Sequence, residues 1–215
     1  MRAILDNLDL YWQGFLTTLA LAVVSAAIAL VLGTLLAAMR VSPVPTLRAA
    51  GTVYVQIVRN TPLTVVFFFV VFVLPELDIG LSFFVFAITA LTVYHAAFFC
   101  EAVRSGINSV AVGQAEAARS IGLSFTQSLR LVILPQAFRT VIPPLINVVI
   151  ALTKNSSIAA AFGVIELTAI GGRLANANAG AVIPLLLGVA ACYLFLTLPS
   201  GWLAGVAERK VAIAR

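Results

Sequence analysis

The sequence predicts an all-α membrane protein with about five transmembrane helices. Hydrophobic residues make up 62% of its 215 residues and charged residues only 10%, and the mean hydropathy is +1.11. One transmembrane helix takes about 20 apolar residues, so about five of them fit in this chain. The apolar runs are continuous, whereas the strands of a membrane β-barrel alternate apolar and polar residues, so we reject a barrel.

The expected spans belong to one domain that covers residues 1–215. They lie at about residues 14–39, 51–74, 81–103, 136–153 and 181–205. Residues 154–180, between the last two spans, show the least regular pattern. Small residues in the first span would let a neighbouring helix approach closely; they are Ala20, Ala22, Ser25, Ala26, Ala29 and Gly33.

The distribution of charge between the loops predicts the orientation. One set of loops collects most of the basic residues, which are Arg40, Arg48, Arg104, Arg119, Arg130, Arg209, Lys210 and Arg215. The other set carries two basic residues beside four acidic ones, namely Arg2, Arg173, Asp6, Asp9, Glu76 and Asp78. Because basic loops stay in the cytoplasm, we expect the N-terminus outside and the C-terminus inside.

Several functions are disfavoured by what the sequence lacks. The net charge of +5 comes from scattered residues, so nucleic acid is not an expected partner. Cys100 and Cys192 stand in apolar stretches without metal-ligand spacing, so no metal site is expected. His95 stands alone and is interpreted as a core residue. With no placed catalytic base and no GK[ST] phosphate loop, we expect no catalytic residues, and an intramembrane enzyme is disfavoured.

The loop at about residues 105–135 contains local signals that predict its secondary structure. Its alanines favour a helix, and Gly122 suits the left-handed stop that follows a helix end. Ser124 with Gln127 three residues later forms a capping box, which starts a second short helix. The sequence therefore predicts a helix, a tight corner and another helix. A plain solvated cytoplasmic loop with some helical content is the alternative.

The second expected span is interrupted by Arg59, Asn60, Thr61, Pro62 and Leu63. Pro62 cannot donate a hydrogen bond to the carbonyl of Val58, and lipid does not tolerate the resulting break unless protein or water covers it. We interpret the stretch as a broken helix that lines a solute path. A simple kink with Arg59 reaching towards the cytoplasm is the alternative. Prolines inside the fourth span predict a second break by the same argument; they are Pro143 and Pro144.

A polar cluster ends the fourth span, and it consists of Lys154, Asn155, Ser156 and Ser157. An ammonium group at membrane depth is costly and usually faces a cavity or a partner. We interpret the cluster as solute-contacting. In the alternative interpretation Lys154 reaches the outer interface or pairs with Glu166. Glu101 and Arg104 are three residues apart on the expected third span and should form a local ion pair.

Several fixed positions of the loop resemble the EAA loop of ABC-importer permeases. Glu116, Ala117 and Ala118 are followed by Gly122 and then by the sequence VILP at residues 132–135. The family pattern is E-A-A, three residues, G, nine residues and I-x-L-P, so Val132 is the one mild departure. The resemblance implies that this loop docks into the ATP-hydrolysing subunit of the importer.

Two further stretches resemble motifs of the polar amino-acid subfamily of these permeases. Residues 59–63 match R-G/N-T-P-L, and residues 152–158 match L-x-K-D/N-[ST]-[ST]-L except for the final Ile158. The resemblance implies that residues of both stretches line the amino-acid path. Asn155 replaces an acid that would suit a cationic substrate, which favours glutamate or glutamine. In length and motif order the whole chain is similar to glutamate-type permease subunits.

The resemblance implies a permease subunit in a bacterial cytoplasmic membrane, with lipid around it. The expected partners are a pair of ABC ATPase subunits, a second identical or homologous permease, and an extracytoplasmic amino-acid-binding protein. ATP and Mg²⁺ would be bound by the ATPase, with no cofactor in this chain. The alternatives are a permease for another small solute, such as another amino acid or methionine, and a structural membrane subunit without transport activity.

Overall fold

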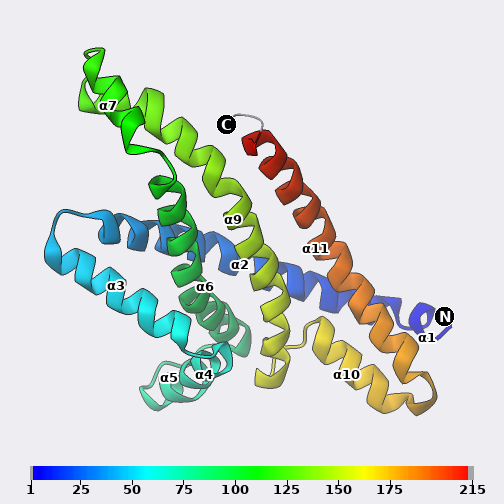
Figure 1. Ribbon diagram of the computed structural model, residues 1–215. Helices are drawn as coiled ribbons and strands as arrows, with labels where there is room; N and C mark the ends of the chain where they lie inside the picture. The colour runs from blue at the N-terminus through cyan, green and yellow to red at the C-terminus, as the bar shows by residue number, and fades with distance from the viewer. Residues whose placement is uncertain (1, 213–215) are drawn as a thin grey trace.

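The computed structural model describes residues 2–212, and the elements assigned in that range are helical (Figure 1). The five longest helices are α2 (Leu8–Val41), α3 (Pro45–Asn60), α6 (Phe83–Asn108), α9 (Leu134–Asn155) and α11 (Val182–Ala212). The shorter α-helices are α1 (Arg2–Leu5), α4 (Leu63–Phe68), α5 (Leu74–Glu76), α7 (Val112–Ser120), α8 (Phe125–Ser128) and α10 (Leu167–Ala177). Turns of π-helix (Phe69–Val73, Leu129–Ile133) and of 3₁₀-helix (Ser156–Phe162, Ala179–Ala181) connect some of them.

The predicted set of spans is confirmed. Four helical segments of the described chain are long and apolar enough to cross a membrane, namely Leu8–Val41, Phe83–Asn108, Thr126–Phe162 and Ala179–Val206. A fifth is the helix pair Pro45–Asn60 and Leu63–Glu76, whose axes are bent by 106°. The protein is therefore an all-α membrane protein with four spans, or five when the bent pair is counted as one.

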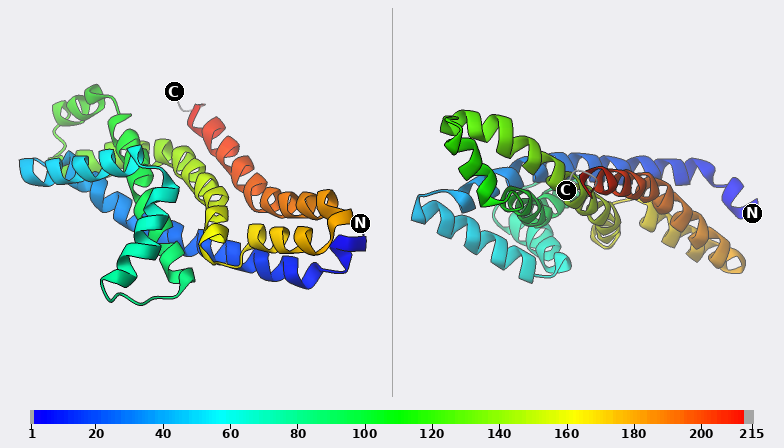
Figure 2. Two further views of the ribbon diagram at one scale, coloured as in Figure 1. Left: turned by 90° about the horizontal axis from the view of Figure 1, so that it is seen from below. Right: turned by 45° about the horizontal axis from the view of Figure 1, so that its top comes forward.

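The spans cross one another at steep angles. α2 runs across α6 and α9, and α3 runs back beside α6 (Figures 1 and 2). The helix α7 and the end of α11 lie at one end of the molecule, and α4, α5 and α10 lie at the other (Figure 1). The residues that matter below lie on α6 and on the helices α2, α3 and α9, which pack against it.

Small residues allow the close packing of α2 on α6, as the sequence predicts for the first span. Ala22, Ser25, Ala29 and Gly33 are all buried in α2. A Cβ atom on Gly33 would lie 2.8 Å from the carbonyl oxygen of Ala96 and 2.9 Å from the amide nitrogen of Cys100. Because both atoms belong to the backbone of α6, no side-chain movement could make room, and only glycine fits there.

The expected break at the prolines of the fourth span is wrong. α9 continues through Pro143 and Pro144 as one helix from Leu134 to Asn155. The two prolines are adjacent, so the backbone hydrogen bonds that they remove fall in a single turn, and the turns on either side remain helical. The region 154–180, whose pattern is the least regular, is divided into short elements, a 3₁₀ segment and the helix α10. Glu166 caps α10 by accepting from the amide of Ala169 at 2.9 Å.

Candidate functional site

A pocket of about 280 Å³ opens between α6 and α9. This volume is at the small end of the range that ligand pockets occupy. The wall is mostly apolar and includes two amide groups; it consists of Tyr94, His95, Phe98, Asn147, Val148, Ala151 and Asn155. Such a wall can hold a small polar solute, because rings supply contact area while a few amide groups fix its orientation.

His95 and Asn155 join the two helices of the pocket. The Nδ1 atom of His95 lies 2.8 Å from the carbonyl oxygen of Leu91, which can only accept, so Nδ1 carries the hydrogen. In the neutral ring Nε2 is then an acceptor, and the amide nitrogen of Asn155 donates to it at 3.2 Å. The expectation of a core histidine holds, since His95 is 1% exposed. Its place in the pocket wall could not be anticipated from a single histidine in an apolar run.

The predicted break in the second span is confirmed and is sharper than a kink. α3 ends at Asn60 and α4 begins at Leu63, after Pro62. Side chains satisfy the carbonyl groups at the end of α3: Asn60 donates to Gln56 at 2.7 Å, and the hydroxyl group of Thr61 donates to Ile57 at 2.8 Å. The freed backbone groups are thus partly covered by the polar residues of the motif itself.

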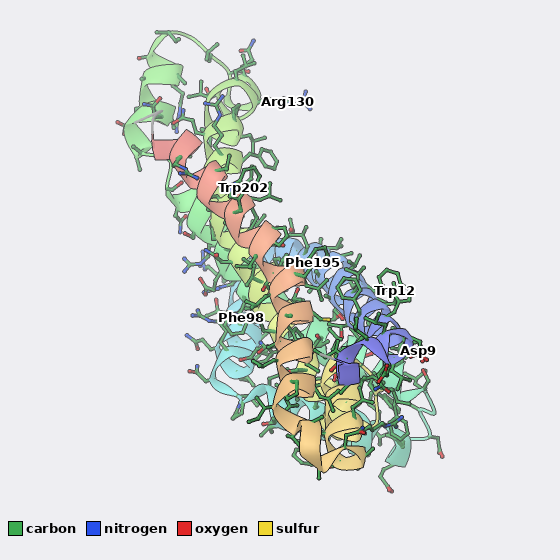
Figure 3. The ribbon with its side chains drawn as sticks, turned by 90° about the vertical axis from the view of Figure 1, so that its right-hand side faces the viewer. Asp9, Trp12, Phe98, Arg130, Phe195 and Trp202 are labelled. Carbon is green, nitrogen blue, oxygen red and sulfur yellow. The ribbon has the colours of Figure 1, made fainter. Side chains whose placement is uncertain are left out.

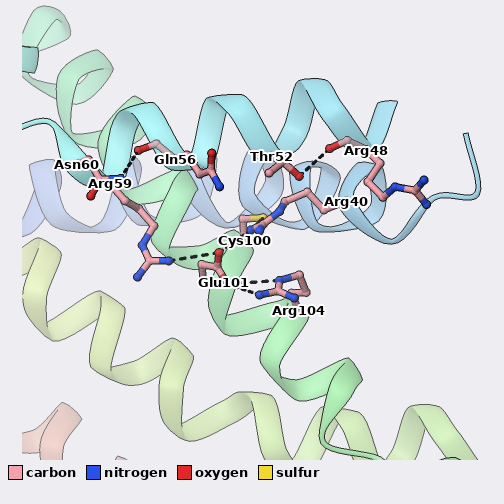
Figure 4. A network of polar contacts seen from close by, with 9 residues as sticks. All are labelled: Arg40, Arg48, Thr52, Gln56, Arg59, Asn60, Cys100, Glu101 and Arg104. Atoms are coloured by element: carbon pink, nitrogen blue, oxygen red, sulfur yellow. Dashed lines mark hydrogen bonds and ion pairs between the residues drawn. The ribbon is translucent and has the colours of Figure 1, made fainter. Parts of the chain in front are cut away.

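Arg59 points into the molecule and meets Glu101 of α6 (Figure 4). Its Nη1 atom lies 3.2 Å from Oε1 of Glu101, and its guanidinium carbon lies 5.7 Å from the ring centroid of Phe98. The side chain of Arg59 therefore has a partner within the protein, on the neighbouring helix α6. Because Phe98 is part of the pocket wall, Arg59 stands beside the pocket.

The predicted pair of Glu101 and Arg104 is confirmed, and it belongs to a larger cluster. Arg104 donates to Oε2 of Glu101 from Nη2 at 3.0 Å and from Nε at 3.3 Å. Arg40, at the end of α2, also pairs with Glu101 through Oε1. The sequence spacing reveals only the local pair, because Arg40 and Arg59 come from other helices and reach Glu101 through the tertiary fold.

The four residues of the Lys154–Ser157 cluster point in different directions. Asn155 faces the pocket, whereas Lys154 and Ser157 border a separate hollow of about 390 Å³ beside Thr168 and Tyr193. Ser156 is buried and donates to the carbonyl of Thr153 at 2.7 Å. Successive residues of a helix are rotated by about 100°, so a consecutive motif cannot present all of its side chains to one cavity.

The alternative partner of Lys154, Glu166, is occupied elsewhere. Its carboxylate is fully buried and accepts from the hydroxyl group of Tyr193 at 2.6 Å, besides the cap of α10. Among the side chains that the structure describes, Lys154 takes part in none of the three ion pairs, all of which involve Glu101. The proposed Lys154–Glu166 pair is therefore wrong for this structure.

The helix–corner–helix loop has the predicted geometry. Gly122 has a φ angle of +87°, and its amide donates to Arg119 at 3.0 Å while the amide of Leu123 donates to Ala118 at 3.1 Å. This pair of bonds is a Schellman motif, which closes the end of α7. The capping box is also present: the amide of Ser124 donates to Gln127 Oε1 at 2.9 Å, and the amide of Gln127 donates to Ser124 Oγ at 3.4 Å.

The surface of α7 is suited to contact with another protein. Glu116 and Ala117 are exposed, whereas Ala118 is buried against the rest of the loop. Two large apolar side chains flank them, Val112 at 74% exposure and Ile121 at 78%. Arg130, in the same loop, lies at the opposite end of the molecule from Asp9 (Figure 3). The small side chains let a partner's backbone approach closely, and the exposed apolar side chains would be buried by the contact.

Metal chemistry finds no support in the part of the chain that the structure describes. Among the described side chains, no group of three or more His, Cys, Asp or Glu residues could hold a metal ion. Both cysteines are free, with Cys100 buried and Cys192 partly buried.

Comparison with known proteins gives concordant matches. The family model described as "Binding-protein-dependent transport system inner membrane component" matches residues 29–213. The glutamate transport system permease protein GluC of Corynebacterium efficiens is 41% identical over 214 residues, which cover 94% of this chain and 93% of that protein. The probable glutamine ABC transporter permease protein GlnM of Bacillus subtilis is 41% identical over 194 residues, 90% of this chain and 89% of that protein.

A solved structure agrees with these matches. The crystal structure of an amino acid ABC transporter with histidines contains a chain with a TM-score of 0.89 and 28% sequence identity. The match covers 96% of this chain and 96% of that chain.

Proposed function

Because the chain belongs to the family of binding-protein-dependent transport system inner membrane components, we propose that its α6–α9 pocket is part of the path of an imported amino acid. The chain is a permease subunit of an ABC importer for polar amino acids, a multi-pass protein of the cytoplasmic membrane and not itself an enzyme. Importers of this kind work with an ATPase and a solute-binding protein. The observation that carries our proposal is the meeting of Arg59, Phe98 and Asn155 around one pocket.

The proposed substrate is glutamate. An amide at position 155 places no negative charge in the pocket, and the guanidinium group of Arg59 stands beside it. Both features suit an anionic solute better than a cationic one. Asn60, Thr61, Pro62 and Leu63 shape the break that brings Arg59 there. In the same proposal Lys154, Ser156 and Ser157 belong to a second polar region of the path, around the hollow that contains Tyr193.

The proposed coupling element is the loop that contains Glu116, Ala117, Ala118 and Gly122. A partner ATPase, which binds ATP and Mg²⁺, would cover the exposed face of α7 and push on it when it closes. The Schellman corner and the capping box give the loop a fixed shape, so the push would pass into α6 and α9. We propose that the permease works as a pair with an identical or homologous chain, because one copy encloses only a small pocket.

ATP-driven uptake into membrane vesicles that hold the assembled importer tests the proposed function. With the binding protein outside and ATP inside, we expect accumulation of glutamate well above that of lysine or methionine. The measurement is the initial uptake rate of each radiolabelled amino acid, with a non-hydrolysable ATP analogue as control. Uptake that is absent for all polar amino acids, or that is fastest for methionine, would contradict the proposal.

The proposed orientation places the N-terminus outside and α7 in the cytoplasm. Single cysteines at two exposed positions test it, in a protein whose Cys100 and Cys192 are replaced by alanine. Leu77, at 63% exposure, lies at the α5 end, and Ile121, at 78%, lies in the corner. In intact cells an impermeant maleimide should label Leu77→Cys but not Ile121→Cys. Opening the membrane should make both react, and the reverse pattern would overturn the orientation.

A further inference from the structure

Three arginines surround the single carboxylate of Glu101. They come from the ends of α2 and α3 and from the next turn of α6, and they are Arg40, Arg59 and Arg104 (Figure 4). With one negative and three positive groups, the cluster has a formal charge of +2. Uncompensated charge in a partly buried cluster at the end of membrane spans is costly and often serves a function. An arriving anion would relieve it.

The three arginines are held to different degrees. The side chain of Arg40 is only 11% exposed. Arg104, which lies in the same helix as Glu101, donates to the carboxylate from two nitrogen atoms. Arg59 uses one nitrogen at 3.2 Å, is 45% exposed, and belongs to a helix that ends one residue later. If Arg59 moves away, Glu101 keeps two partners, so no unpaired buried carboxylate is left behind. Arg59 is therefore the arginine that can leave the cluster at the smallest cost.

The position of Arg59 links the cluster to the pocket. Its guanidinium group lies over Phe98, which is a wall of the pocket, whereas Arg104 approaches Glu101 from the other side (Figure 4). A guanidinium group stacked on a ring can pivot towards a carboxylate while it keeps its contact with the ring face. A short movement could thus exchange the partner of Arg59 from Glu101 to a solute in the pocket.

We propose that Arg59 is a charge-selecting arm, which exchanges between Glu101 when the pocket is empty and a carboxylate of the transported amino acid when it is occupied. Glu101 is a positioning residue that competes with the solute and so promotes its release. This inference rests on the proposed function and adds the means by which the pocket selects an acidic side chain, an exchange of Arg59 between Glu101 and the solute. No covalent step is involved, only the exchange of one ion pair for another.

Equilibrium binding of radiolabelled glutamate and glutamine tests the arm, using the transporter purified through a tag on this chain without binding protein. Arg59→Gln should weaken glutamate binding by about 10- to 100-fold, as expected for a lost charge-assisted contact, and glutamine binding by less than about threefold. Arg59→Lys should restore part of the preference. The matched control is Arg104→Gln, which removes the same charge from Glu101 away from the pocket and should leave the ratio of the two affinities unchanged.

The variant Glu101→Gln tests whether Glu101 positions Arg59 or only stabilises the fold. Without its competitor the arm should hold glutamate more tightly, so the Kd for glutamate should fall several-fold while the uptake rate also falls. If Glu101→Gln instead disrupts the structure, the binding of both amino acids should weaken. The arm is then tested by Arg59→Gln alone, because Glu101 keeps two partners in that variant.

Each outcome of these measurements bears on the inference. An unchanged glutamate-to-glutamine ratio in Arg59→Gln would overturn the arm, as would equal losses in Arg59→Gln and Arg104→Gln, or a wild-type preference for glutamine. In all three cases the polar amino-acid function would stand. A wild-type transporter that binds neither amino acid would instead refute the proposed function.

Discussion

Gly122→Val should prevent the ATPase from staying bound to the permease while leaving membrane insertion intact. The φ angle of Gly122 is +87°, a conformation that costs other residues about 1–2 kcal/mol and β-branched residues more. Nothing lies within 4 Å of the position that a Cβ would take, so the strain comes from the backbone alone. If the corner gives way, α7 is no longer held at its angle. A loss of 1–2 kcal/mol corresponds to about 5- to 30-fold weaker ATPase association.

The measurement is the amount of ATPase that copurifies with the tagged permease from membranes, together with the uptake rate. Gly172→Val is the matched control, because Gly172 also has open space around its Cβ position but lies in α10, at the other end of the molecule from α7 (Figure 1), without a positive φ angle. The control should retain most of the bound ATPase. Equal retention by both variants would show that the corner does not carry the coupling.

The helices that the sequence predicts well are those whose signals are local. Continuous apolar runs are enough to place the spans within a few residues, as the match between 81–103 and α6 illustrates. Gly122 and the Ser124–Gln127 pair act within four residues of one another, so the corner is also predictable. The break at Pro62 belongs to the same class, although its bend of 106° depends on how α4 packs.

The pocket could be predicted only in part. Arg59 and Asn155 stand out because a charge or amide is rare in an apolar segment. Their meeting place depends on Phe98 and His95, which resemble any other core residues in sequence. Of the cluster around Glu101, the sequence predicts only the local pair with Arg104 and not the pair with Arg40. The prolines of α9 predict a break that the helix does not have. The pocket wall and the cluster were missed because they depend on contacts between helices, which the period of one helix does not encode. The break in α9 was expected wrongly because the helix tolerates two adjacent prolines.

Asn155→Asp should reverse the charge preference of the pocket. The amide of Asn155 donates to Nε2 of His95, and a carboxylate cannot make that donation to a neutral ring. The substitution would also place a negative charge in the wall that a glutamate side chain must approach. Two carboxylates about 6 Å apart repel each other by about 3 kcal/mol at an effective dielectric constant of about 20. We therefore expect glutamate binding to weaken by about 100-fold and lysine binding to strengthen.

The most direct test of the pocket as the amino-acid path is the pair of dissociation constants for glutamate and lysine, measured on the purified transporter without binding protein. Asn176→Asp, at an exposed position of α10, is the control for an added charge outside the pocket. Our account predicts that Asn155→Asp inverts the ratio of the two constants while Asn176→Asp leaves it as in the wild type. A ratio that is the same in all three proteins would contradict it.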